Sequence, residues 1–90
     1  MAKFIFTYGS EGQPFVGGWT VVVANDMPEA IRIFNAIHPP KIPNLVNCGS
    51  IYTEEGFMKT SMSKSKYGNL GHRCHEIISV NLKLTKGENE

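Results

Sequence analysis

The sequence predicts an α+β domain, in which an antiparallel or mixed sheet of about four strands carries one main helix on one face. Two segments near opposite ends of the chain, "KFIFTY" and "HEIISVNLKL", alternate in the period of two that is typical of half-buried strands. A capped amphipathic helix stands between them. Because 90 residues bury too little surface to support two cores, we expect a single domain over residues 1–90, with residues 85–90 as a flexible tail.

Strand-forming residues on both sides of a glycine-rich segment predict the first two strands. Phe4, Phe6 and Tyr8 fall on one side of the first strand, and aromatic side chains suit a pleated, half-buried surface. The second strand, "WTVVVA" at residues 19–24, is apolar on both sides, which favours a central position. The intervening "GSEGQPFVGG" indicates a wide hairpin connection.

The clearest helix signal lies in "NDMPEAIRIFNAIHPP". Asp26 is a good N-cap, Glu29 follows at capping-box spacing, and Pro28 occupies the first turn, where its missing N–H costs nothing. A Pro-Pro pair ends the helix. We expect Arg32 and Asn35 to face water, opposite an apolar stripe. The stripe consists of Ala30, Ile31, Ile33, Phe34 and Ile37.

The second half of the chain has weaker signals. Residues 45–52 predict a strand interrupted at Gly49, and Thr53 before two glutamates resembles the start of a short helix that runs to about Lys59. Residues 60–73 have no period and predict a long loop. The last strand alternates cleanly, so we expect it to be packed on one face only.

Charge is nearly balanced over the chain, at +1, and gives no global argument for nucleic acid or a membrane. The chain has no signal-peptide h-region and no stretch of about 20 apolar residues. We therefore expect a location in the cytoplasm, no membrane partner, and two free thiols at Cys48 and Cys74.

Charge is unevenly distributed, however, because residues 59–73 contain no carboxylate. Basic, hydroxyl and glycine residues in one stretch can hold an anion such as phosphate, although the same composition also suits a solvated loop. Tyr67 offers a stacking surface, and Tyr8 and Phe15, which flank the glycine-rich hairpin, could border a pocket. The predicted ligand-binding residues are Lys59, Lys64, Lys66, Tyr67, His72, Arg73 and Tyr8.

A zinc or thiol site is the alternative. Permitted zinc ligands are present at Cys48, His72, Cys74 and His75. Their spacing is unlike that of a zinc knuckle, and adjacent residues of a strand point to opposite faces. His72 could activate Cys74, but nothing in the sequence supplies a group to orient the imidazole. We therefore expect no catalytic residue, no metal and no cofactor.

Four segments together carry a resemblance to known proteins: "YGSEGQPFVGGWTVVVAND", "PEAIRIFNAIHP", "IYTEEGF" and "CHEIIS". In these the chain resembles small proteins encoded by phages and prophages of Firmicutes, which share a GGW segment, an EAxxxF helix and a CHE strand. The resemblance covers most of residues 3–80 and brings no known catalytic role.

That resemblance implies a non-catalytic accessory protein that antagonises host antiviral defence, as anti-CRISPR proteins do. It would sequester a phosphate-bearing signalling nucleotide or occlude an effector that handles nucleic acid. The expected partner is thus a host defence protein or a signalling nucleotide, with contact to nucleic acid or mimicry of it as a further route. An exposed sheet edge could also pair the chain with a second copy. Hydrolysis of a signalling nucleotide ranks last.

Overall fold

The computed structural model describes residues 1–64 and 74–79, with the side chain of residue 64 left out. Four strands and three helices follow one another along this part of the chain. They are β1 (Ala2–Thr7), β2 (Trp19–Ala24), α1 (Met27–Ile37), β3 (Ser50–Thr53), α2 (Glu54–Met58), α3 (Ser61–Lys64) and β4 (Cys74–Ser79). The predicted α+β class is confirmed. None of the described helices combines the length and apolar character that crossing a bilayer requires.

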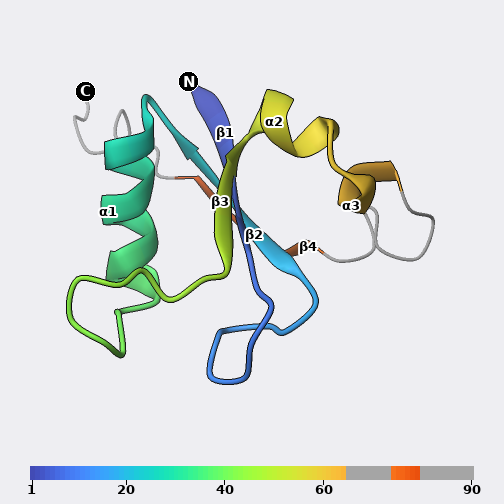
Figure 1. The fold of residues 1–90 in the computed structure, drawn as a ribbon. Helices are drawn as coiled ribbons and strands as arrows, with labels where there is room; N and C mark the ends of the chain where they lie inside the picture. Colours follow the sequence, from blue (N-terminus) through green and yellow to red (C-terminus); the bar gives the residue numbers. More distant parts are fainter. Residues whose placement is uncertain (65–73, 80–90) are drawn as a thin grey trace, which may run out of the picture.

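The sheet is mixed, in the order β3-β1-β2-β4. β1 is antiparallel to both β2 and β3, whereas β2 and β4 are parallel. Strands that run parallel need a crossover between them. α1 lies in the connection from β2 to β3, on one side of the sheet, and the two short helices lie in the connection from β3 to β4, on the other (Figure 1).

The larger part of the core lies between α1 and the sheet. Phe34 of α1 stacks on Phe6 of β1, with ring centroids 4.3 Å apart and planes 4° apart. These rings are fully buried together with small and branched side chains, so the face predicted for the helix is the one that packs. The other buried members of this cluster are Phe4, Tyr8, Val22, Ala24 and Ala30.

A smaller cluster covers the opposite face of the sheet. Trp19 of β2 meets Phe57 of α2 edge-on, at 5.0 Å between ring centroids, a favoured aromatic geometry. Ile5 and Val21 complete the cluster. Both faces of β1 and β2 are therefore buried, which agrees with the central position predicted for residues 19–24.

The predicted helix caps are present. The Asp26 carboxylate accepts from the Glu29 N–H at 2.9 Å, and the Glu29 carboxylate accepts from the Asn25 N–H at 2.6 Å. Thr53 caps α2 by accepting from the Gly56 N–H at 3.0 Å. Local hydrogen-bonding side chains thus set where both helices begin.

Four expectations about local structure need correction. The interrupted strand of residues 45–52 is paired in the sheet only from Ser50, and Leu45 instead forms an isolated bridge with Ile42. A helical turn, α3, occupies the start of the predicted loop. In α1, Asn35 is only half-exposed: its Oδ1 is buried and has no hydrogen-bond partner among the described residues. Ile37 of the predicted apolar stripe is 52% exposed.

Candidate functional site

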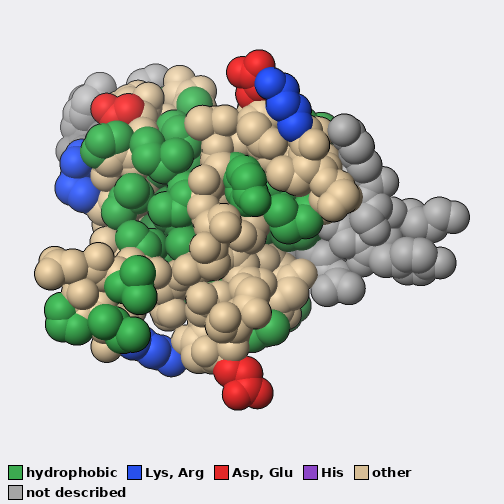
Figure 2. Space-filling model, viewed as in Figure 1, with side chains coloured by type: hydrophobic (Ala, Val, Ile, Leu, Met, Phe, Trp, Pro, Cys, Tyr) green, Lys and Arg blue, Asp and Glu red, His purple; other side chains and the backbone are tan. Residues whose placement is uncertain are grey.

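Two loops that are far apart in the sequence form a groove at one end of the sheet. They are the hairpin loop, residues 8–18, between β1 and β2, and the post-α1 loop, residues 38–49, between α1 and β3. Figure 2 shows apolar side chains gathered between α1 and β3 and again at the post-α1 loop. We refer to the space between these two loops as the groove.

The hairpin loop is braced by its own hydrogen bonds. Tyr8 N–H donates to the Gly18 carbonyl at 3.0 Å. The Gln13 side-chain oxygen accepts from the N–H groups of Gly9 and Ser10, at 2.7 and 3.1 Å. Gly12 has a φ of +91°, which favours glycine. The loop therefore presents a defined wall to the groove.

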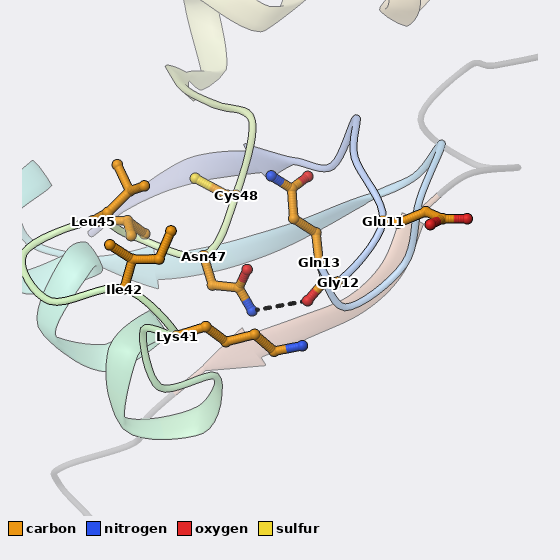
Figure 3. A pocket seen from close by; sticks show the side chains of 9 residues that line it. Glu11, Gly12, Gln13, Lys41, Ile42, Leu45, Asn47 and Cys48 are labelled. Carbon is orange, nitrogen blue, oxygen red and sulfur yellow. Dashed lines mark hydrogen bonds between the residues drawn. The ribbon is translucent and has the colours of Figure 1, made fainter.

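The post-α1 loop is attached to the hairpin and to the sheet. Asn47 Nδ2 donates to the Gly12 carbonyl at 3.5 Å (Figure 3), and Gly49 N–H donates to the Thr7 carbonyl at 2.6 Å. A Cβ atom at Gly49 would lie only 3.3 Å from that carbonyl oxygen. Glycine thus allows the close approach that brings the loop alongside β1.

Two adjoining hollows make up the groove, with volumes of about 190 Å³ and about 470 Å³. We call them the inner and the outer hollow. They share Gly12, Gln13, Lys41 and Asn47. The inner hollow adds Glu11, Ile42, Leu45, Val46 and Cys48 (Figure 3). The outer hollow adds Pro14, Ile37, His38, Pro39 and His75.

The polar part of the outer hollow combines one ammonium group with two imidazoles and two side-chain amides. Its described lining includes Lys41 and two imidazoles, His38 and His75, and has no carboxylate. Glu11, on the inner hollow, points away from the Lys41 ammonium (Figure 3). Among the side chains that the structure describes, no carboxylate forms an ion pair with Lys41. The outer hollow is therefore suited to an anionic group.

A chain of hydrogen bonds runs from the outer hollow into the core. His38 Nε2 bonds the Glu76 carboxylate, which also accepts from the Thr20 hydroxyl at 3.0 Å. Tyr8 and Thr20 hydroxyl oxygens are 2.5 Å apart. Because the Thr20 proton is directed to Glu76, the Tyr8 hydroxyl is the donor in this last bond.

These hydrogen bonds, together with burial, shift the pKa values of Glu76 and Tyr8. Burial alone would raise the pKa of Glu76, but the hydrogen bonds from His38 and Thr20, with the nearby His75, lower that pKa below its ordinary value of 4.5. Burial raises the pKa of Tyr8 to about 12. Near neutral pH, Glu76 is therefore an anion held by donors and Tyr8 is a neutral phenol.

His75 is directed out of the sheet by a bulge. The register of β2 and β4 passes from Trp19 opposite Cys74 to Thr20 opposite Glu76, so His75 has no partner residue in β2. Its imidazole stacks on Phe15 of the hairpin loop, with ring centroids 4.8 Å apart and planes 9° apart. Bulges commonly re-aim side chains beside functional sites.

The structure places the residues predicted from the sequence in very different positions. Tyr8 is only 3% exposed and belongs to the core rather than to the border of a pocket. Lys59 is exposed and lies 3.9 Å from Glu55, one helical turn earlier. The structure does not describe the remaining predicted residues, which are the side chain of Lys64 and the whole of Lys66, Tyr67, His72 and Arg73. The phosphate-binding stretch at 59–73 thus stays a prediction.

The two thiols lie on opposite faces of the sheet. Cys48 packs against the cluster beside α1, and Cys74 against the cluster that contains Trp19, so they do not converge on one ion. Burial raises the pKa of Cys48 to about 11 and also raises the pKa of Cys74. Within residues 1–64 and 74–79 there is no group of three potential metal ligands.

Comparisons with protein-family models, with curated protein sequences and with solved structures give no match to this chain.

Proposed function

We propose that the protein is a small non-catalytic binding protein of the phage type, which holds a phosphate-bearing signalling nucleotide in the groove. By sequestering that signal it would antagonise a host antiviral defence system. The observation on which the proposal rests is the Lys41 ammonium, which lies on the outer hollow and has no carboxylate partner among the described side chains, whereas the neighbouring His38 is bonded to Glu76. A cation that is not neutralised by a neighbouring carboxylate is available to an anionic ligand.

Several features favour binding over turnover. Nucleophilic catalysis by a cysteine or a threonine needs a thiolate or an activated hydroxyl. Burial raises the pKa of both thiols, so they are protonated near neutral pH. The Thr20 hydroxyl is fully buried and hydrogen-bonded to Glu76. Sequestration needs only a complementary surface, which a chain of 90 residues can provide.

Calorimetric titration with AMP, together with thermal-shift screening of linear and cyclic nucleotides, tests the proposal. We expect Lys41→Ala to weaken AMP binding about tenfold, the effect of losing one hydrogen bond to a charged group. Lys3→Ala, which removes the same charge from an exposed position on β1, should change affinity little. Raising NaCl from about 50 mM to about 500 mM should weaken binding, because salt screens exposed charges.

Other outcomes would redirect the proposal. If Lys59→Ala with Lys66→Ala abolishes binding while Lys41→Ala does not, the ligand lies at residues 59–73. Conversion of a nucleotide by sub-stoichiometric protein would show a hydrolase instead. Stoichiometric zinc in the purified protein, lost together with the fold on chelation, would favour the metal alternative.

A further inference from the structure

We propose that the stacked rings of His75 and Phe15 form a platform for a nucleobase, so that the groove recognises a nucleoside phosphate by its base as well as by its charge. This inference rests on the proposed function, because it takes the anionic end of the ligand to lie at Lys41. It adds the nucleobase of the ligand and the two residues, His75 and Phe15, that would hold it.

The platform has the geometry that base stacking needs. The two rings are nearly parallel, 9° apart, with centroids 4.8 Å apart. Phe15 is 44% exposed and His75 is also exposed, so the pair lies at the surface instead of filling the core. Base stacking on aromatic side chains contributes substantially to affinity and tolerates any base, because every base has a π-face.

The backbone around His75 is shaped to present it. At the bulge in β4, His75 has no opposing residue in β2, and its side chain reaches the hairpin loop. Phe15, in turn, sits in a loop that is fixed by its own hydrogen bonds, such as the Gly18 N–H donating to the Phe15 carbonyl at 2.9 Å. Both rings are therefore held before a ligand arrives, which reduces the entropy lost on binding.

The platform borders the space where the anion would lie. His75 lines the outer hollow together with Lys41 and His38. Phe15 covers one face of the imidazole, and His75 is exposed and lines the outer hollow, so the proposal places the base on the face that Phe15 leaves uncovered. The volume of about 470 Å³ falls within the range of small-molecule pockets, about 300–1,000 Å³. Pro14 and Pro39 supply apolar walls, so a flat ring and a phosphate can be held side by side.

The test compares three probes by calorimetry: AMP, ribose 5-phosphate and adenosine. Stacking of the base should make AMP bind about tenfold more tightly than ribose 5-phosphate. His75→Ala and Phe15→Ala should remove most of that difference, whereas His75→Phe, which keeps a ring, should retain it. Val16→Ala, at an exposed apolar neighbour of Phe15, is the matched control and should leave the AMP affinity unchanged.

The probes separate failure of this inference from failure of the proposed function. Equal affinity for AMP and ribose 5-phosphate, both weakened by Lys41→Ala, would overturn the nucleobase platform and leave the phosphate site standing. If none of the three probes binds, both proposals fail. Both also fail if AMP binds but neither His75→Ala nor Lys41→Ala alters its affinity. Circular dichroism of each variant checks that the fold is retained.

Discussion

Thr20 is a buried hydroxyl on which two other polar groups depend. It is fully buried and bonded to the Tyr8 hydroxyl at 2.5 Å and to the Glu76 carboxylate at 3.0 Å. A polar group that loses its partner inside a protein costs more free energy than the hydrogen bond contributes net. Removing the Thr20 hydroxyl should therefore disrupt the whole series of hydrogen bonds that joins Tyr8, Thr20, Glu76 and His38.

Replacing Thr20 with valine tests this dependence with little change in shape. We expect Thr20→Val to lower the free energy of unfolding by about 1–3 kcal/mol, because Tyr8 and Glu76 each lose a bond. The measurement is urea unfolding followed by far-UV circular dichroism. Thr7→Val is the matched control, since Thr7 Oγ1 donates one long bond, 3.3 Å, to the Ser50 carbonyl. If Thr20→Val and Thr7→Val lower the free energy of unfolding equally, the hydrogen bonds of Thr20 are not cooperative.

At the level of elements, the sequence predicted those features of the fold that are determined by residues close together in the chain. The boundaries of the first two strands and of α1 follow from local signals, such as the period of two, the Asp26 cap and the terminal prolines. The strand order and the parallel pairing of β2 with β4 do not, because the pairs of β1 with β3 and of β2 with β4 join residues more than 40 positions apart in the chain.

The site was harder to predict than the fold for the same reason. The groove is formed by residues 8–18 and 38–49, and neither segment has a recognisable ligand-binding motif. His38 and Lys41 flank the prolines that end α1, so "HPPK" indicates a helix terminus and no more. The density of reactive residues around His75 was visible, but the bulge that turns its ring toward Phe15 was not.

The cap of α1 provides a direct test of these local signals. Asp26 accepts from the Glu29 N–H at 2.9 Å, which satisfies one of the otherwise unpaired amides of the first turn. We expect Asp26→Ala to lower the free energy of unfolding by about 1 kcal/mol, and Asp26→Ser, which keeps an acceptor, to lower it much less. Chemical denaturation measures both, and a similar loss in the two variants would mean that the negative charge matters more than the hydrogen bond.

At the scale of the whole molecule, the Glu76 side chain links the edge strand β4 to the end of α1 and to the core. On one side it meets His38, directly after α1, and on the other Thr20 of β2. The His75 imidazole also lies near the carboxylate and contributes to its lowered pKa. Protonating Glu76 should therefore loosen the contact between the edge strand and the helical layer, and with it the wall of the groove that carries His75.

The sign of the resulting pH dependence follows from the lowered pKa of Glu76. A carboxylate whose pKa is lower in the folded state than in the unfolded state contributes stability above its ordinary pKa, here 4.5, and this stability is lost as the pH falls through the folded value. We expect the urea midpoint to be steady near neutral pH and to fall below about pH 4.5. In Glu76→Gln part of this acid loss should disappear, because the amide does not titrate. Glu11→Gln, at an exposed position, should follow the wild-type curve; if instead it flattens the acid limb as much as Glu76→Gln does, the stabilisation comes from net charge and not from the contacts of Glu76 with His38 and Thr20.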